Sequence, residues 1–269
     1  MALRDPITSA SNPRVKDLVR LRERRYRDRT GRFLVEGYRE MRRALERPVE
    51  LEALFVCPAL YLGDNEAGII DRAASTGCEI VELAEGPFRK ASYRDRPEGL
   101  LGVARHFAVD LDGIRLAESP LLLVVESIEK PGNLGTMLRT AAAARVDGVI
   151  VADPTTDPFN PNVIRASLGL VFTVALAVTS SEAAIGWLGD AGVSIVATSP
   201  EASLAHHDTD LTGPTAIVVG SEQYGLSEAW FAAADERVRI PMPGAADSLN
   251  AATAAAVVLF EALRQRPRR

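Results

Sequence analysis

Residues 121–125 read Leu-Leu-Leu-Val-Val, and this apolar run constrains the fold more than any other stretch of the chain. A strand with one wet face alternates apolar and polar side chains, whereas a strand covered by helices on both faces of a parallel sheet is apolar throughout. Similar runs alternate with helix-like segments toward the C-terminus, which is the pattern of a parallel α/β sheet. Ligands of such sheets bind at the carboxyl ends of the strands. The loops to examine therefore follow Val125, Val196, Val219 and Ile240.

Apolar runs that alternate with helix-like segments locate the other elements of this second half of the chain. The predicted strands are 121–125, 148–152, 171–178, 193–198, 216–220 and 237–240. The predicted helices are 136–145, 162–168, 182–191, 227–234 and an alanine-rich closing helix that runs to residue 265. Asp247 and Ser248 are favourable N-cap types, so we expect the closing helix to begin about there.

The first 107 residues form a smaller alternation of strands and helices. We expect a helix over 7–25, with Asn12 as its cap and Pro13 in its first turn, followed by a polar loop over 24–32. Predicted strands follow at 33–35, 51–56, 79–83 and 99–105, with helices at 36–45, 67–75 and 87–92. The chain thus divides into a first domain (1–107), a linker (108–119) and a second domain (120–269).

Composition excludes several classes of protein. Hydrophobic residues make up 47% and charged residues 25%, as in ordinary globular proteins, and no apolar run is long enough to cross a membrane. The N-terminus has no signal-peptide core. Cys57 and Cys78 fit no metal spacing, so we expect free thiols in a reducing cytoplasm. The adjacent His206 and His207 do not form a metal site either, and we expect none.

The net charge of −5 argues against a nucleic-acid partner, but the distribution of charge reverses that conclusion. Between residues 14 and 47 basic residues outnumber acidic ones, and nearly all are arginine, whose planar fork suits phosphates and base stacking. A basic end on an acidic protein is typical of a domain that docks RNA. The alternative is a solvated helix face with ion pairs. The candidate RNA-binding residues are Arg14, Arg22, Arg24, Arg25 and, farther along, Lys130.

Nucleotide-binding motifs are absent where this architecture would carry them. No strand is followed by a Gly-x-Gly-x-x-Gly fingerprint. Gly220 and Gly225 have the glycine spacing of a phosphate loop, but Leu226 occupies the position of the lysine that would pair with phosphate. We therefore reject ATP and NAD as ligands.

Three loops remain, and together they resemble the motifs of the SpoU (TrmH) family of S-adenosylmethionine-dependent RNA ribose 2′-O-methyltransferases. The first, Asn-x-Gly-x-x-x-Arg-x-Ala, is matched by Asn133, Gly135, Arg139 and Ala141. The second, Gly-x-Glu-x-x-Gly, is matched by Gly220, Glu222 and Gly225. The third, Ile-Pro-Met-x-Gly-x-x-x-Ser-Leu-Asn, is matched over 240–250. The first domain is similar to a ribosomal-protein-like substrate-binding domain, and Lys130-Pro131 replaces an Asp-Pro common before the first motif.

The resemblance implies an α/β fold whose C-terminal parallel sheet carries a deep trefoil knot, beside a small N-terminal α/β RNA-binding domain. It implies S-adenosylmethionine as cofactor, held by Gly220, Ile240 and Leu249, with Thr198, Met242 and Ser248 as further contacts. Apolar walls with a few backbone hydrogen bonds suit an adenosine. The resemblance also implies a homodimer through the C-terminal domain, and the alanine-rich face of the closing helix fits close helix approach.

The same resemblance assigns the catalytic residues. Arg139 is the candidate that orients the ribose hydroxyl and a neighbouring phosphate and accepts the proton, although arginine is an awkward base. Asn133 and Asn250 are expected to hold Arg139, the cofactor and the ribose in line. Glu222 either pairs with Arg139, anchors its loop, or is a structural carboxylate that caps loop N–H groups.

Two rival interpretations stay open. The first is a base-methylating relative with the same knot, against which the match of Ser248, Leu249 and Asn250 argues. The second is an inactive RNA-binding relative, against which the intact Asn133, Arg139, Glu222 and Asn250 argue. For the substrate, the two-domain plan favours 23S rRNA over tRNA.

Overall fold

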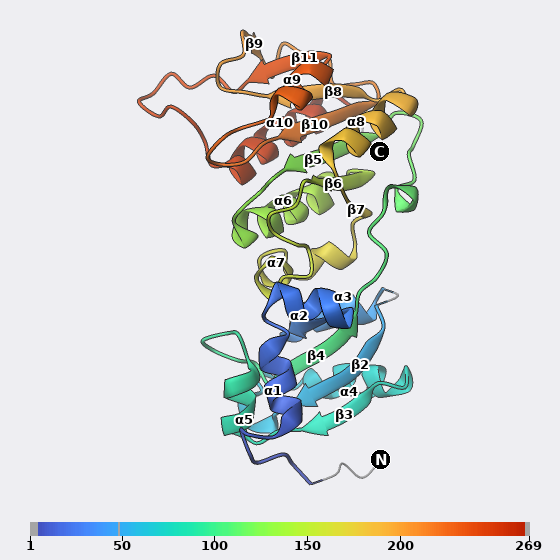
Figure 1. Ribbon diagram of the computed structural model, residues 1–269, viewed down its shortest axis with the longest axis vertical. Helices are drawn as coiled ribbons and strands as arrows, with labels where there is room; N and C mark the ends of the chain where they lie inside the picture. The colour runs from blue at the N-terminus through green and yellow to red at the C-terminus, as the bar shows by residue number, and fades with distance from the viewer. Residues whose placement is uncertain (1–4, 48, 267–269) are drawn as a thin grey trace. The chain divides into compact units, whose positions relative to one another are not determined.

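A computed structural model describes residues 5–47 and 49–266. The chain forms two compact units, each with its own sheet (Figure 1). The first unit contains the chain up to Phe107 together with Asp157–Thr173, and the second contains Ala108–Thr156 and the chain from Val174 onward. Residues 157–173, which the sequence-based division places in the second domain, therefore pack within the first unit.

The first unit is built on a mixed four-stranded sheet of order β1-β4-β2-β3. Strands β1 (Arg32–Glu36) and β2 (Leu51–Val56) run antiparallel to β4 (Leu100–Arg105), and β3 (Glu79–Glu82) runs parallel to β2. The helices are α1 (Pro13–Arg20), α2 (Arg24–Thr30), α3 (Tyr38–Leu45), α4 (Glu66–Ser75) and α5 (Glu85–Ala91), with a 3₁₀ turn at Pro58–Leu60. Leu18, Leu34, Phe55 and Phe88 are buried in its core.

The start of the chain is more helical than predicted. Asn12 caps α1 by accepting a hydrogen bond from the backbone N–H of Arg14, and Pro13 lies in the first turn, as expected. The predicted loop over 24–32 is wrong, because residues 24–30 form α2. This helix ends at Gly31, whose φ of 62° is favourable for glycine, and it is anchored by the buried side chain of Arg27.

Residues 157–173 join the first unit through aromatic and ionic contacts. The rings of Phe159 and Phe172 lie 5.0 and 6.0 Å from that of Phe33 on β1. Asp157 accepts a hydrogen bond of 2.6 Å from the buried guanidinium of Arg27. The segment forms α7 (Pro161–Ala166) and a 3₁₀ turn at Leu170–Phe172. The predicted strand 171–178 is therefore wrong in its first half, because Phe172 is taken up by this aromatic cluster.

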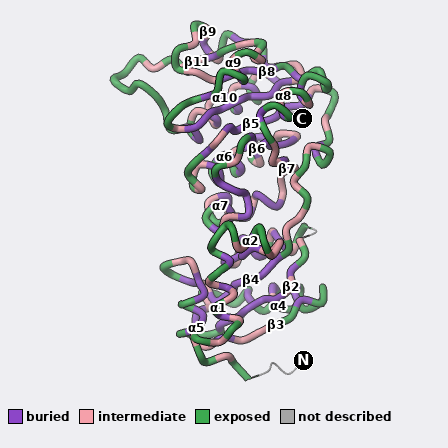
Figure 2. The backbone as a smooth tube through the Cα atoms, in the orientation of Figure 1, coloured by how far each residue is buried: buried purple, intermediate pink, exposed green. Residues whose placement is uncertain are grey.

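The second unit contains a seven-stranded sheet of order β7-β6-β5-β10-β8-β11-β9, in which every neighbouring pair is parallel. Its strands are β5 (Leu121–Glu126), β6 (Gly148–Ala152), β7 (Leu176–Thr179), β8 (Ser194–Thr198), β9 (Leu204–Ala205), β10 (Thr215–Val219) and β11 (Glu236–Arg239). All residues of β5, β6 and β10 are buried (Figure 2). The prediction of a parallel sheet from the apolar run is confirmed.

The helices of this unit are α6 (Pro131–Ala144), α8 (Ser181–Asp190), α9 (Glu228–Ala233) and α10 (Ala251–Gln265), and a 3₁₀ turn forms at Leu111–Gly113. Helix α10 packs against α6, and α8 packs against α9. The predicted cap of the closing helix at Asp247 or Ser248 is wrong. Asn250 caps α10, because its side-chain oxygen accepts hydrogen bonds from the N–H groups of Ala252 and Thr253.

The described part of the chain was also expected to lack membrane spans, disulfides and metal sites. None of its helices is long and apolar enough to cross a bilayer. Cys57 and Cys78 are buried free thiols. Within residues 5–47 and 49–266, no group of three or more His, Cys, Asp or Glu side chains is placed to hold a metal ion.

Candidate active site

Two adjoining pockets open where β8, β10 and β11 end, at the carboxyl edge of the sheet. The larger has a volume of about 560 Å³, within the range of small-molecule sites. It is lined by the segment after β8 (198–201), the loop after β10 (219–226) and the start of α10. The smaller, of about 90 Å³, lies between Thr198, Ile240, Met242 and Leu249. Between them, the two pockets are thus lined by three of the four loops indicated by the sequence.

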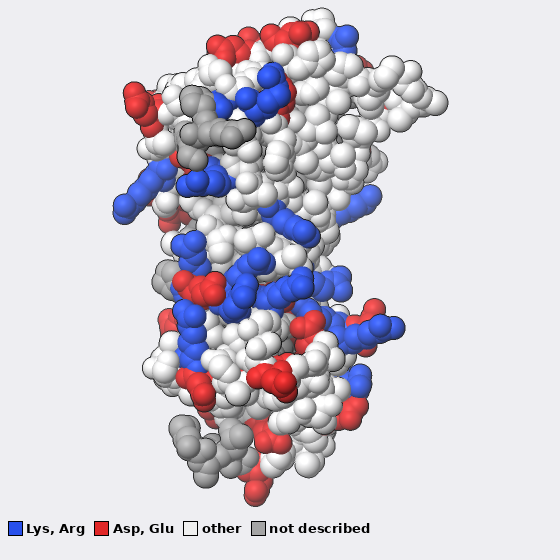
Figure 3. All heavy atoms as spheres, turned by 180° about the vertical axis from the view of Figure 1, so that it is seen from behind, with Lys and Arg blue, Asp and Glu red and all other residues white. Residues whose placement is uncertain are grey.

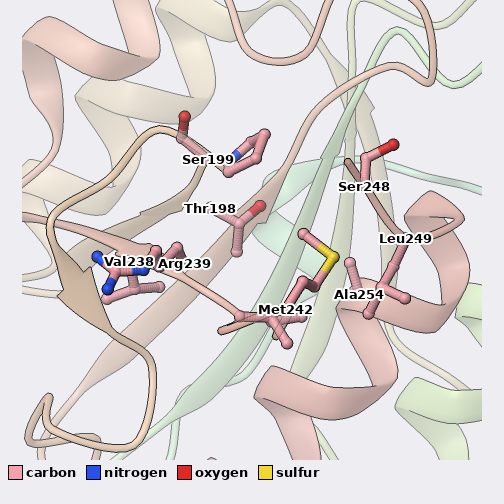
Figure 4. A pocket seen from close by; sticks show the side chains of 10 residues that line it. Thr198, Ser199, Val238, Arg239, Met242, Ser248, Leu249 and Ala254 are labelled. Carbon is pink, nitrogen blue, oxygen red and sulfur yellow. The ribbon is translucent and has the colours of Figure 1, made fainter. Parts of the chain in front are cut away.

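The smaller pocket is mainly apolar. Thr198 and Met242 face each other across it, and Leu249 and Ala254 lie beside Met242 at the beginning of α10 (Figure 4). The hydroxyl of Thr198 donates a 2.9 Å hydrogen bond to the carbonyl oxygen of Val218, so it is satisfied within the sheet. The guanidinium of Arg239 donates to the carbonyl oxygens of Ala202 and Ser203 and points away from Met242 (Figure 4).

The structure brings together all of the residues predicted to bind a cofactor. Each of them lines one or both pockets: Thr198, Gly220, Ile240, Met242, Ser248 and Leu249. They come from three separate segments, and three of them, Thr198, Ser248 and Leu249, line both pockets. An apolar wall that continues into a larger, more polar space can take a ligand with one flat apolar part and one polar part.

The loop after β10 is closed on itself. The N–H of Ser221 donates to the carbonyl oxygen of Gly225 at 3.0 Å, and the N–H of Gly225 donates back to Ser221 at 3.1 Å. A Cβ atom on Gly220 would lie 2.2 Å from the carbonyl carbon of Gly225, so no larger residue fits without moving the loop. Gly220 is therefore required by the close approach of two backbone segments, whereas Gly225 is favoured because its φ is 68°.

Three polar side chains from the three motifs form one hydrogen-bonded chain. The side-chain Nδ2 of Asn133, in the first turn of α6, donates to Oε1 of Glu222. The Nδ2 of Asn250 donates to Oδ1 of Asn133 at 3.2 Å. Glu222 and Asn250 line the larger pocket. We call Asn250, Asn133 and Glu222 the amide relay.

The relay shows which partner Glu222 has in the single chain. Its carboxylate contacts Asn133, and within the described residues it forms no ion pair with Arg139. The second carboxylate oxygen of Glu222, Oε2, is buried and has no hydrogen-bond partner in the described part of the chain. Its connection to Asn133 means that Glu222 anchors the first motif to the second.

Arg139 lies apart from the pockets. It is exposed on α6, lines neither pocket, and forms no hydrogen bond or ion pair with any residue that the structure describes. The desolvated setting that would let a guanidinium accept a proton is therefore missing around it in the single chain. Its catalytic role stays a prediction.

Sequence reasoning missed Glu126, which supports the site from behind. Its Oε2 accepts a 2.8 Å hydrogen bond from the N–H of Ser227, just after the second motif, and its Oε1 accepts one from the hydroxyl of Ser181. Trp230 donates to the same hydroxyl from its indole N–H at 2.8 Å. The signal in the sequence was a carboxylate directly after an apolar strand, at the edge where parallel sheets bind ligands.

Comparison with known proteins identifies this arrangement. The model of the SpoU rRNA Methylase family matches residues 120–260, which include all three motifs and both pockets. The chain belongs to the SpoU rRNA methylase family. A second model, the MRM3-like substrate binding domain, matches residues 12–102 of the first unit.

Two 23S rRNA methyltransferases match nearly the whole chain. The 23S rRNA (uridine(2479)-2'-O)-methyltransferase of Streptomyces viridochromogenes is 33% identical over 91% of this chain and 87% of that protein. The 23S rRNA (guanosine(2553)-2'-O)-methyltransferase RlmP of Bacillus subtilis is 29% identical over 94% of this chain and 97% of that protein.

Solved SpoU structures show the same fold. An RNA 2'-O ribose methyltransferase is 42% identical with a TM-score of 0.85, over 97% of this chain and 98% of that chain. The AdoMet-bound rRNA methyltransferase of Sinorhizobium meliloti is 33% identical with a TM-score of 0.88, over 97% of each chain. AviRb of Streptomyces viridochromogenes, in complex with AdoMet, is 30% identical with a TM-score of 0.86, over 94% of this chain and 98% of that chain.

The predicted RNA-binding arginines of this SpoU chain differ in their surroundings. Arg14 is held by Glu79 in a two-pronged ion pair, with distances of 2.7 and 3.0 Å. Arg22 donates to the carbonyl oxygens at the end of α5, and Arg24 lies 3.7 Å from Asp28. Arg25 is exposed. On the face shown in Figure 3, Lys and Arg side chains lie among acidic ones.

Proposed function

We propose that this chain transfers a methyl group from S-adenosylmethionine to a ribose 2′-hydroxyl of 23S rRNA. The amide relay carries the proposal, since Glu222 and Asn250 line the larger of two adjoining pockets and Asn133 is hydrogen-bonded to both. Between them, the two pockets are lined by the six predicted cofactor residues. Membership of the SpoU family and relatives that act on 23S rRNA support the same reaction and substrate.

The residues of the two pockets fit this cofactor. The apolar walls around Met242 and Leu249 suit the adenine ring, and the close approach of Gly220 to Gly225 leaves backbone groups at the pocket surface. The larger pocket has room for the amino-acid part and for the ribose that receives the methyl group. When bound, the cofactor supplies an electrophilic methyl group on a sulfonium.

The chemistry left to the protein is alignment of the hydroxyl and removal of its proton, for which Arg139, once it has itself lost a proton, is the candidate acceptor. The ribose oxygen must approach opposite the bond that breaks, so positioning accounts for much of the rate. Asn250 and Asn133 orient the acceptor ribose and the first turn of α6, and Glu222 holds Asn133 in place. Arg139 orients the hydroxyl and the neighbouring phosphate.

A methyl-transfer assay tests this function. The purified chain is incubated with methyl-labelled S-adenosylmethionine and either unmodified 23S rRNA or tRNA, and the labelled nucleoside is then mapped. We expect a 2′-O-methylnucleoside in 23S rRNA. A labelled base would overturn the reaction class, and label in tRNA alone would overturn the substrate.

We also propose that the chain is located in the cytoplasm, where its rRNA substrate is made. Cell fractionation that finds the chain elsewhere would contradict this location.

We further propose that the chain works as a homodimer through α10. Phe260 and Leu263 are 49% and 41% exposed on this helix, and Ala256 and Val257 on the same face are half-buried. An apolar stripe of this kind on a helix that otherwise packs on α6 fits a second copy of the same helix.

The dimer is tested by changing the stripe. Phe260→Glu should convert the chain to a monomer in analytical ultracentrifugation, because the carboxylate would lose its hydration on association. Leu62→Glu is a matched control, since Leu62 is 79% exposed in the first unit. A wild-type monomer at micromolar concentration, or a Phe260→Glu variant that stays dimeric, would contradict the proposal.

The last proposal concerns topology. We propose that the segment from β11 to α10 passes through a neighbouring loop as a trefoil knot. Its support is that β11 lies beyond β8 in the sheet, whereas α10 returns across β10 to pack on α6. A crystal structure in which this segment can be drawn out without passing through a loop would reject the knot.

A further inference from the structure

Tyr224 is the most exposed aromatic side chain of the second unit, at 78%. It occupies the tip of the loop after β10, within the motif Gly220-Ser221-Glu222-Gln223-Tyr224-Gly225. Its backbone N–H donates to the hydroxyl of Ser221 at 3.0 Å, and Ser221 is itself paired with Gly225. A large apolar ring is thus displayed to solvent by a loop that is held rigidly at its base.

The surroundings of Tyr224 are those of the reaction site. It lines the larger pocket together with Glu222, Leu249 and Asn250. It is not among the residues that line the smaller, apolar pocket. Tyr224 therefore borders the larger pocket and not the smaller, apolar one.

Lys130 supplies a positive charge to the same pocket. It is the one cation among the described lining residues, and it forms no ion pair with any residue in the described part of the chain. It precedes the first turn of α6, three residues before Asn133. An exposed ring and an unpaired ammonium on one pocket form the two contacts that a single nucleotide needs, one for its base and one for its phosphate.

We propose that Tyr224 stacks on the base of the nucleotide that is methylated, while Lys130 contacts its phosphate. This inference rests on the proposed function and specifies its substrate as a nucleotide whose base is unstacked from its neighbours. A base within an RNA helix has no free face, whereas a base in a loop or a flipped base can lie against an aromatic ring. Stacking accepts any base, so Tyr224 selects an accessible nucleotide and not a sequence.

Steady-state kinetics with the mapped 23S rRNA fragment test the role of the ring. Tyr224→Ala should raise KM for RNA about 5- to 150-fold, the loss expected for one stacked base. Tyr224→Phe and Tyr224→Trp should keep KM within about 3-fold, because both retain an aromatic face. The Kd for S-adenosylmethionine, measured by calorimetry, should not change. Leu62→Ala is the control for loss of an exposed apolar side chain.

Three results would overturn the inference. The first is an unchanged KM for RNA in Tyr224→Ala. The second is an equal rise in KM in Tyr224→Phe, which would assign the effect to the hydroxyl. The third is a loss of cofactor affinity in Tyr224→Ala that parallels the rise in KM. A second readout uses RNA with 2-aminopurine at the target nucleotide. Its emission should be quenched by the wild type and by Tyr224→Phe but not by Tyr224→Ala, and equal quenching by all three would also overturn it.

The role of the Lys130 charge is tested separately, by the salt dependence of RNA binding. Lys130→Gln should weaken RNA binding and reduce the slope of log K against log salt by about 0.7 to 0.9, the value for one phosphate contact. An unchanged slope would remove Lys130 from the proposal. If the wild type transfers no methyl group to RNA ribose, the proposed function fails. If it does and the Tyr224 variants match it, only this inference fails.

Discussion

The side-chain amide of Asn133 donates a hydrogen bond to the carboxylate of Glu222, although 89 residues separate them in the sequence. This contact joins the first motif of the chain to the second, and Asn250 joins the third to both. The relay explains why an amide and a carboxylate are needed at these two positions, since one must donate and the other accept.

Asn133→Asp should lower kcat about 100-fold, because two carboxylates would face each other and displace the first turn of α6. The double variant Asn133→Asp with Glu222→Gln restores a donor opposite an acceptor, and it should recover at least about 10-fold of that loss. Single-turnover methyl transfer measures both. A double variant no faster than Asn133→Asp would mean that Glu222 acts on the substrate itself and does not position Asn133.

Arg139→Lys should lose most of the activity although it keeps the charge, because lysine cannot present a planar fork to a hydroxyl and a phosphate together. We expect kcat to fall about 100-fold. Since Arg139 is exposed and bonded to no described residue, the melting temperature and cofactor affinity should stay at wild-type values. A near-normal rate for Arg139→Lys would remove this residue from the mechanism.

Gly220→Ala should open the loop after β10, because its Cβ would meet the backbone of Gly225 at 2.2 Å. The affinity for S-adenosylmethionine, measured by calorimetry, should fall at least about 10-fold, which corresponds to 1.4 kcal/mol. Gly189→Ala is the matched control, since nothing lies within 4 Å of its added methyl group on α8. Equal affinities for the two variants would show that the loop tolerates the larger residue.

Arg266→Ala should destabilise the second unit. The buried guanidinium donates to the carbonyl oxygens of Ser119, Pro120, Leu211 and Gly213, and its removal leaves buried acceptors unpaired. We expect a loss of about 3 kcal/mol or more in urea unfolding. Arg264→Ala, two residues earlier, removes an ion pair in which the arginine side chain is 67% exposed, and it should shift the midpoint far less than Arg266→Ala. Similar midpoints for the two variants would contradict the anchoring role of Arg266.

Stability should fall as the pH drops below about 6.5 because of His106. Burial lowers the pKa of this imidazole below its ordinary value of 6.5. Its ring stacks on Phe159 at 4.0 Å. The neighbouring carboxylates of Asp157 and Asp28 oppose the shift, and the Arg27 guanidinium adds to it. The unfolded chain then binds the proton more tightly than the folded one, so stability is present at higher pH and is lost as the pH falls.

His106→Phe keeps the ring and removes the proton site, so its free energy of unfolding should depend less on pH between 7.5 and 5.5 than that of the wild type, a range of about one unit on either side of 6.5. Urea titrations at several pH values measure this slope. Identical slopes in the two proteins would show that His106 does not titrate with unfolding.

Much of the fold could be predicted because its signals are local. The apolar run 121–125 predicted a buried parallel strand, and β5 is buried at every residue. Asn12 and Pro13 predicted the start of α1. The same local reasoning failed for 24–30, where a polar segment is helical because Arg27 finds a buried partner in Asp157, 130 residues away.

The candidate site, too, has features that the sequence predicted and features that it did not. The sequence by itself determined which loops carry the site, because strand–loop–helix junctions lie at the edge of a parallel sheet. The six residues that line the pockets came from the resemblance of the three motifs to the SpoU family. Only the tertiary structure decided that Glu222 pairs with Asn133, that Asn250 caps α10, and that Arg139 lies outside the pockets. The order of the strands brings β5, β10 and β8 together, and pairings across such distances depend on that order and not on any local pattern.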